Sequence, residues 1–181
     1  MNFESTPIDG LFIVRPTRHA DDRGHFARLW GDADFAAAGH PFRPTQISTS
    51  FTLRRGTLRG MHWQAPPHAE TKLVRPVRGR IFDVAVDLRP HSPRWGAWFG
   101  LDLDAGEGSG LLIPAGFAHG FLTLTDEAEV LYLIDAPHCP EAARGARWDD
   151  PLLGVAWPFP PAVIAARDRD WPLLRRPEPG G

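Results

Sequence analysis

Cysteine, lysine and tyrosine each occur only once in the chain. Its 181 residues include a single cysteine, Cys139, a single lysine, Lys72, and a single tyrosine, Tyr132. One cysteine excludes an internal disulfide and a cysteine-based zinc cluster. By comparison, the chain has nineteen arginines and eleven phenylalanines. This bias indicates that two positions need an ammonium group and a phenol, which arginine and phenylalanine do not supply.

The sequence also lacks a strong net charge and long apolar stretches. Twenty basic and 22 acidic residues give a formal net charge of −2, which does not favour a nucleic acid as partner. No apolar run approaches the roughly 20 residues of a membrane-spanning helix, and the first residues do not resemble a signal peptide. We therefore expect a cytoplasmic protein with no membrane partner. The length predicts one domain over residues 1–181, with a loose tail after about residue 172.

Turn residues are abundant and evenly spread. Nineteen prolines and eighteen glycines separate short runs of alternating or β-branched residues. Many short strands between turns are typical of an all-β sandwich or barrel. The runs are LFIVRP, PTQISTSF, KLVRPV, RIFDVAVDL, WGAWFGLDL, GLLIP, AHGFLTL and EVLYLI. One short helix is predicted over residues 32–38, capped by Asp32 and ended by Gly39, and a second helical or irregular piece over residues 162–168.

The run RIFDVAVDL, residues 80–88, alternates most regularly. One strand face is apolar, and Asp83 and Asp87 share the other face. Two interpretations stay open at this point. In the first, the strand lies at the surface and both carboxylates are exposed to water. In the second, this face lines a barrel and both carboxylates are buried groups of a site.

The segment GTLRGMHWQ, residues 56–64, contains two candidate site residues at an awkward spacing. Arg59 and His62 are three positions apart, so a regular strand directs them to opposite faces. Gly60 lies between them and is suited to a β-bulge that would bring both to one face. The alternative is a surface arginine and an ordinary half-buried histidine.

A metal-binding cupin would place a glycine, five residues, a His-x-His pair and a later glutamate before a Pro-x-Gly-x-x-His motif. Here Gly56, His62 and the segment PAGFAH, which ends at His119, fit this pattern. Gln64 stands where the second histidine of the pair belongs, and the metals used at such sites need three or four imidazole or carboxylate ligands. We therefore predict no metal.

Longer segments carry a resemblance to a known family. They are GTLRGMHWQAPPHAETKLVRPVRGRIFDVAVDLRPHSPRWGAWFGLDL, IPAGFAHGFLTLTDEAEVLY and RWDDPLLGVAWP, together with DDRGHFARLW and IAARDRDWPLL. From about Asp9 to Leu174 the chain resembles the dTDP-4-dehydrorhamnose 3,5-epimerases. The resemblance implies a cupin-type jelly-roll β-barrel with short peripheral helices, no metal or other cofactor, and a homodimer that exchanges strands.

The resemblance also implies the reaction. A proton is removed beside the ketone of a nucleotide-linked 4-keto-6-deoxy sugar and returned to the opposite face, converting dTDP-4-dehydro-6-deoxy-D-glucose to dTDP-4-dehydro-L-rhamnose. Such carbon acids are weak, so a base must lie at the proton and cations at the oxygen. By resemblance His62 is the base and Asp168 holds its imidazole. Lys72 and Arg59 stabilise the enolate, and Tyr132 is the acid.

Further positions are assigned to substrate binding by the same resemblance. Arg23 meets the diphosphate, and Phe26 and Gln46 lie nearby. His119 lines the pocket with Asp83 behind it, and His138 belongs to the wall around the substrate.

The chain departs from the family pattern at Arg28, Ser48 and Leu133, where glutamate, asparagine and lysine are frequent. At Pro137 and His138 it lacks a common pair of tyrosines. Because these positions surround nucleotide and sugar in the family, an epimerase that inverts only carbon 3 or only carbon 5 stays open. The alternatives from other classes are a metal-dependent cupin and a non-catalytic cupin that binds sugar nucleotides.

Overall fold

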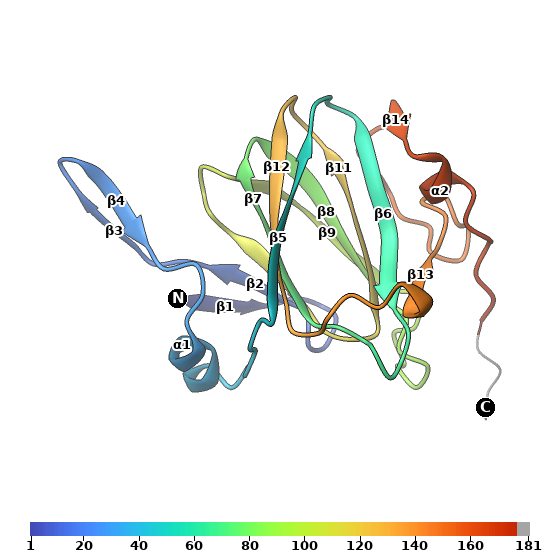
Figure 1. Cartoon of the computed structure of the whole chain (residues 1–181), viewed down its shortest axis with the longest axis horizontal. Helices are drawn as coiled ribbons and strands as arrows, with labels where there is room; N and C mark the ends of the chain where they lie inside the picture. The colour runs from blue at the N-terminus through green and yellow to red at the C-terminus, as the bar shows by residue number, and fades with distance from the viewer. Residues whose placement is uncertain (177–181) are drawn as a thin grey trace.

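The structure, a computed structural model, describes residues 1–176, and its two large sheets face each other as a barrel (Figure 1). The first sheet has the order β1 (Asn2–Ser5), β2 (Phe12–Arg15), β10 (Gly110–Ile113), β7 (Lys72–Arg78), β12 (Ala128–Ile134) and β5 (Gln46–Thr52). The second has the order β13 (Ala143–Gly145), β6 (Thr57–Gln64), β11 (Phe117–Thr123), β8 (Arg80–Asp87) and β9 (Trp98–Asp104), and β14 (Val163–Ile164) runs parallel to β6. Each of the eight runs overlaps a strand, so the predicted all-β, cupin-type barrel is confirmed.

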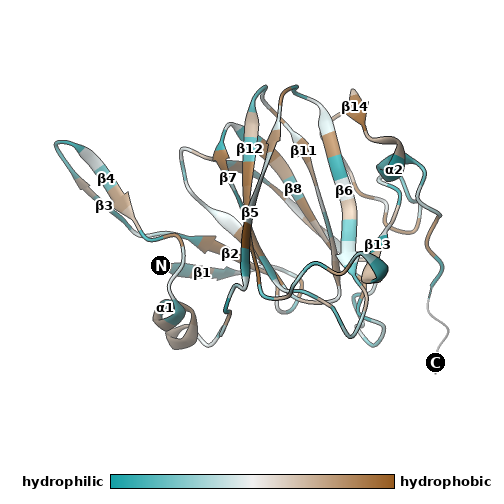
Figure 2. Cartoon of the chain, viewed as in Figure 1, coloured by the Kyte–Doolittle hydropathy of each residue, from teal (hydrophilic) through white to brown (hydrophobic). Residues whose placement is uncertain are grey.

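Apolar side chains from both sheets fill much of the barrel and also cover its outer faces. Inside, Val74 of the first sheet packs with Ile81 and Phe121 of the second, all of them buried. Outside the first sheet, Phe35 packs with Leu133 in a separate cluster. Burying one such side chain contributes roughly 1.5–3 kcal/mol, so these clusters hold the strands that carry the polar site. Hydrophobic colour runs along the barrel strands in Figure 2.

The short helices lie at the periphery, as predicted. Helix α1 covers Asp32–Ala37, and Gly39, with φ +78°, follows its end. Its N-cap is Gly31, so the prediction that Asp32 caps the helix is wrong; the Asp32 carboxylate instead accepts a hydrogen bond of 2.9 Å from Arg43. The segment near residue 165 contains both β14 and α2 (Ala166–Arg169), and a 3₁₀ turn covers Pro140–Ala142.

The burial of β8 in the structure decides whether Asp83 and Asp87 are exposed to water or buried inside the barrel. Asp83 and Asp87 are both fully buried, so the interpretation as solvent-exposed carboxylates is wrong. Asp87 accepts hydrogen bonds of 2.6 Å from Arg89 and from Ser92. Burial by itself would raise the pKa of Asp87, but these donors hold it below its usual range. Asp83 belongs to the site inside the barrel.

The predicted bulge in β6 is present at Gly60. His119 of β11 lies opposite His62, and Phe121 lies opposite Arg59, so β6 uses one residue more than β11 over the same length. Gly60 has φ +138°, and a Cβ atom there would lie 2.5 Å from Cα of Gly120. Only glycine fits this close backbone approach. The bulge brings Arg59 and His62 to the same cavity.

Two segments extend from the barrel. The hairpin of β3 (Arg18–Asp21) and β4 (Gly24–Ala27) projects away from it, and its tip is hydrophilic (Figures 1 and 2). The C-terminal segment after β14 instead packs against β6 and β13, where Trp171 lies over Gly145. The Leu174 N–H donates to Asp150 over 2.6 Å, so the tail expected to be loose after about residue 172 is anchored at that point. Residues 177–181 of that tail lie outside the described part.

Candidate active site

A cavity of about 340 Å³ opens inside the barrel between the two sheets. Among the described residues, no helix is long and apolar enough to cross a membrane. The lining of the cavity is rich in titratable and cationic side chains. They are Arg59, His62, Glu70, Lys72, His119, Tyr132, His138, Arg144, Arg167 and Asp168, with Ser50, Trp63, Phe121, Ile134 and Ala143.

One wall carries a histidine–carboxylate pair. Nε2 of His62 lies 2.7 Å from Oδ1 of Asp168, and the Gly60 N–H donates to Oδ2 of the same carboxylate over 3.2 Å. Burial alone would raise the pKa of Asp168, but the bonds from His62 and Gly60 hold it below its usual range. The ionised carboxylate accepts and Nε2 of His62 donates, so in the neutral imidazole the lone pair lies on Nδ1. This arrangement suits a general base.

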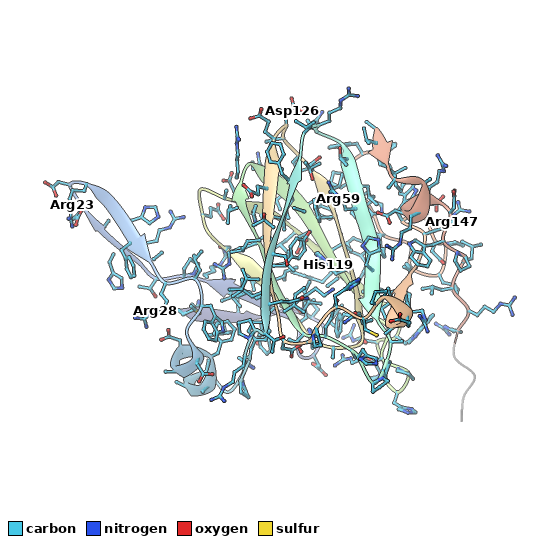
Figure 3. The ribbon with its side chains drawn as sticks, viewed as in Figure 1. Arg23, Arg28, Arg59, His119, Asp126 and Arg147 are labelled. Atoms are coloured by element: carbon cyan, nitrogen blue, oxygen red, sulfur yellow. The ribbon has the colours of Figure 1, made fainter. Side chains whose placement is uncertain are left out.

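A second pair of the same kind lies deeper. Nε2 of His119 is 2.7 Å from Oδ1 of Asp83, and both side chains are buried. His119 also meets the Tyr132 ring edge to face, with ring centroids 6.2 Å apart. The side chains of Arg59 and His119 both lie within the barrel in Figure 3. The structure thus brings Asp83, His119 and His62 together on the adjacent strands β8, β11 and β6.

Tyr132 reaches the cavity from the sheet that faces His62. It lies on β12 of the first sheet, whereas His62 lies on β6 of the second. Burial raises the pKa of Tyr132 well above its ordinary value, and the nearby Ser50 hydroxyl, 3.3 Å from the phenol oxygen, offsets only part of this effect. The phenol therefore keeps its proton at neutral pH and can act as an acid.

Two cations face the space between these groups. Nζ of Lys72 lies 2.6 Å from Oε1 of Glu70 at the start of β7. Arg59 on β6 donates to the Thr52 hydroxyl over 3.0 Å and to the Phe51 carbonyl over 3.2 Å. These bonds fix the direction of both positive groups, and fixed cations stabilise an oxyanion more effectively than mobile ones.

The structure does not bring all predicted substrate-binding residues to the cavity. His138 lines it, but Arg23 and Phe26 lie on the projecting hairpin, with exposed fractions of 85% for the Arg23 side chain and 67% for Phe26 (Figure 3). Arg23 is paired with Asp21 at 2.5 Å. Gln46 begins β5 and does not line the cavity.

The positions that depart from the family pattern are also dispersed. Arg28 pairs with Asp34 at 3.2 Å beside α1, and Leu133 packs on the outer face of the first sheet. Ser48 lies opposite Tyr132 on the exposed strand β5 but does not line the cavity. Within the single chain Leu133 does not face the cavity, because side chains alternate along β12: Tyr132 points inward and Leu133 points outward.

Three charged lining residues were missed by the sequence reasoning. Glu70 precedes Lys72 by two positions, Arg167 immediately precedes Asp168, and Arg144 lies on β13 beside β6. For Glu70 and Arg167, closeness in sequence to a predicted catalytic residue is a signal that could have identified them. For Arg144 no local signal exists, because the pairing of β13 with β6 is a long-range contact.

The site does not present a metal-binding arrangement. Within residues 1–176, no group of three histidine, cysteine or carboxylate side chains could hold a metal ion. Gln64, which replaces a ligand histidine of metal cupins, uses its amide on the chain itself. It donates to the carbonyls of His68 and Pro137, at 3.0 and 3.2 Å, and accepts from the Cys139 N–H at 2.6 Å. Gln64 thereby joins the loop that contains His68 to the loop that contains Pro137 and Cys139.

Comparison with known proteins identifies the family. The family model described as dTDP-4-dehydrorhamnose 3,5-epimerase matches residues 5–176. The chain belongs to this family. The epimerase is 42% identical to the dTDP-4-dehydrorhamnose 3,5-epimerase of Methanothermobacter thermautotrophicus, over 96% of this chain and 94% of the relative. It is 35% identical to the dTDP-4-dehydrorhamnose 3-epimerase of Streptomyces niveus, over 100% of this chain and 87% of the relative.

A solved structure supports the same assignment. The epimerase superimposes with a TM-score of 0.93 on the Bacillus anthracis dTDP-4-dehydrorhamnose 3,5-epimerase, a crystal structure with TDP and PPi bound. The two are 35% identical, and the match covers 96% of this chain and 99% of the other. The predicted family and isomerase class are therefore confirmed.

The lowered pKa of Asp168 predicts a pH-dependent contribution to stability. Its carboxylate binds protons less tightly in the folded state, so its stabilisation is complete above the ordinary value of 3.8 and is lost as pH falls through the lower folded value. Asp168→Asn should therefore lower Tm at pH 7, and the difference from the unmodified protein should shrink below about pH 4. Thermal unfolding followed by circular dichroism between these limits measures it. A difference that stays constant with pH would contradict this origin.

Proposed function

We propose that the epimerase inverts carbon 3 and carbon 5 of dTDP-4-dehydro-6-deoxy-D-glucose to give dTDP-4-dehydro-L-rhamnose. The observation that carries this proposal is the placement of a base and an acid on opposite walls of one cavity. His62, held by Asp168, faces the lumen from the second sheet, and Tyr132 faces it from the first. Inversion needs a proton removed on one face of the sugar and returned on the other, which two facing walls provide.

Two cations of the cavity stabilise the enolate intermediate of this reaction. Removal of a proton beside the ketone moves negative charge onto the ketone oxygen, and the enolate is stabilised where fixed donors meet that oxygen. Lys72 supplies a compact ammonium and Arg59 a guanidinium held by Thr52. The leaving proton passes to Nδ1 of His62, and Asp168 stabilises the resulting imidazolium. The phenol of Tyr132 then supplies the proton on the other face.

The nucleotide and the partner subunit belong to the same proposal. Arg144 and Arg167 line the cavity and supply positive charge for a diphosphate. We place the enzyme in the cytoplasm as a homodimer. The projecting hairpin, with Arg23 and Phe26 exposed, supports a dimer in which each hairpin reaches the other subunit's cavity. In that dimer Gln46 and Ser48, on the exposed strand β5, would lie near the exchanged segment.

Proton NMR of dTDP-4-dehydro-6-deoxy-D-glucose incubated with the enzyme in deuterated water tests the function. Loss of signal at both carbon 3 and carbon 5, with appearance of the rhamnose product, is the expected result. Exchange at one carbon would replace the proposal by a single-site epimerase. No exchange, with dTDP still bound, would leave a non-catalytic sugar-nucleotide-binding cupin, and stoichiometric metal in the active protein would favour a metal-dependent cupin.

The single-site epimerase is the second candidate, and one feature of the cavity favours it. His138 lines the wall where the family commonly has a tyrosine, and an imidazole leaves a smaller, more polar surface there. Double epimerisation requires the sugar ring to change its conformation between two proton transfers, so the shape of this wall bears on whether the second transfer occurs. The relative from Streptomyces niveus carries the name of a 3-epimerase.

Tyr132→Phe should separate proton removal from proton return. Phenylalanine keeps the ring against His119 but has no acidic proton. Product formation should therefore fall by about 10²-fold, while deuterium exchange on the original face, catalysed by His62, falls much less. Exchange and epimerisation are measured in the same NMR experiment. Equal rates of product formation in Tyr132→Phe and the unmodified enzyme would remove Tyr132 from the acid role.

A further inference from the structure

Glu70 is the one acidic side chain of the cavity that no step above employs. It lies in the loop before β7 and lines the same cavity as the base, the acid and the two cations. Its Oε1 is 2.6 Å from Nζ of Lys72, and the two side chains are only 10% and 7% exposed. A carboxylate in this position needs an explanation, because its own charge repels an enolate.

The geometry of lysine supplies the explanation. Lysine carries its ammonium on a flexible four-carbon stem, and without a fixed partner the charge samples several positions. Burial of an unpaired ammonium costs more than burial of the same ammonium in a hydrogen-bonded ion pair. The ammonium has three donors, and the Glu70 carboxylate takes one. The remaining donors are left for a ligand oxygen in the cavity.

We propose that Glu70 is the positioning residue of Lys72, holding its ammonium in the cavity at the place where the ketone oxygen of the substrate arrives. The inference rests on the proposed function for its chemical purpose, but the geometry it describes exists without substrate. Glu70 acts through Lys72 and contributes no proton to the sugar. The charge of Glu70 weakens the attraction for the enolate to some degree, and the gain lies in a fixed direction of the ammonium.

The single lysine makes this geometry directly measurable. Labelling with [15Nζ]lysine gives one side-chain ammonium signal, because Lys72 is the only lysine. In the unmodified protein at neutral pH we expect an observable proton–nitrogen correlation, since the hydrogen bond and burial slow exchange with water. Glu70→Ala should lose this correlation, and Glu70→Gln, which keeps an acceptor oxygen, should retain it with a changed shift. Asp102→Ala, which removes an exposed partner of Arg80 at 3.2 Å, is the matched control and should change nothing.

Kinetics test the consequence for catalysis. Glu70→Ala should lower kcat by about tenfold or more with a KM change of less than about threefold, and Glu70→Gln should recover most of that loss. In the Lys72→Ala background, Glu70→Ala should have no further effect on the slow residual exchange, because the residue acts through the lysine. A Glu70→Ala effect of the same size in both backgrounds would overturn the proposal.

The two experiments separate this inference from the proposed function. An ammonium signal identical in Glu70→Ala and the unmodified protein overturns the positioning role even when the enzyme is active. Absence of any exchange on the sugar by the unmodified enzyme overturns the proposed function, while the NMR signal still decides the position of Lys72. A lower Tm of Glu70→Ala with unchanged kcat would show that Glu70 is only structural, which also overturns the proposal.

Discussion

His62→Ala is expected to reduce deuterium exchange at carbon 3 and carbon 5 of the substrate by about 10³-fold or more. Within the cavity, His62 is the histidine whose carboxylate partner comes from the C-terminal segment, and its side chain is 42% exposed, so a substrate can reach it. His119, the other paired histidine, is buried against Asp83 and does not offer the same access. Removal of His62 thus leaves no equivalent base. The measurement is the rate of signal loss in deuterated water.

A surface histidine provides the control for this prediction. His91 is exposed in the loop between β8 and β9, so His91→Ala should keep the exchange rate and the circular dichroism spectrum. Asp168→Asn should retain more exchange than His62→Ala, because the imidazole remains but loses its orientation and the stabilisation of its charged form. If His62→Ala folded normally and exchanged at near the unmodified rate, the base would have to be sought at His119.

Lys72→Arg is expected to lower kcat by about 10²-fold although the positive charge is kept. The Lys72 side chain is 7% exposed and ends 2.6 Å from Glu70, which leaves no room for the broader guanidinium in the same position. Its planar donors would pair with Glu70 side by side and direct the charge away from the ketone oxygen. Initial rates of product formation at saturating substrate measure the effect, with thermal unfolding as the check on folding.

The matched control is an exchange of the same two residue types on the surface. Arg78 is exposed at the end of β7 and forms an ion pair with Glu127, so Arg78→Lys should change neither kcat nor Tm appreciably. Near-normal turnover by Lys72→Arg would show that charge alone suffices at this position. The single use of lysine in the chain would then have no catalytic explanation.

Much of the fold could be predicted because the relevant signals are local. The alternation of β8 placed Asp83 and Asp87 on one face, and the glycine between Arg59 and His62 indicated the bulge that brings them together. Local patterns do not show which face of a strand meets the lumen, so the burial of Asp83 became visible only when β8 was paired with β9 and β11. The individual site residues came from a resemblance and not from spacing.

The missed features depend on contacts between distant segments. Arg144 reaches the cavity because β13 pairs with the end of β6, a contact about which its own neighbours carry no information. The role of Glu70 was missed because the position of the Lys72 ammonium cannot be read from the sequence. In the proposed dimer the positions of Arg23 and Phe26 depend on a second chain, and a single sequence does not define where a projecting hairpin packs.

The C-terminal origin of Asp168 has a consequence for how activity arises during synthesis. The ribosome completes β12 at Ile134 and β13 at Gly145 before it adds α2. A nascent chain that ends at Gly145 thus contains every strand that carries Lys72, Arg59 and Tyr132, but part of the cavity wall and the carboxylate partner of His62 are still missing. Catalytic competence therefore reports that the C-terminal segment has been translated and has packed against β6.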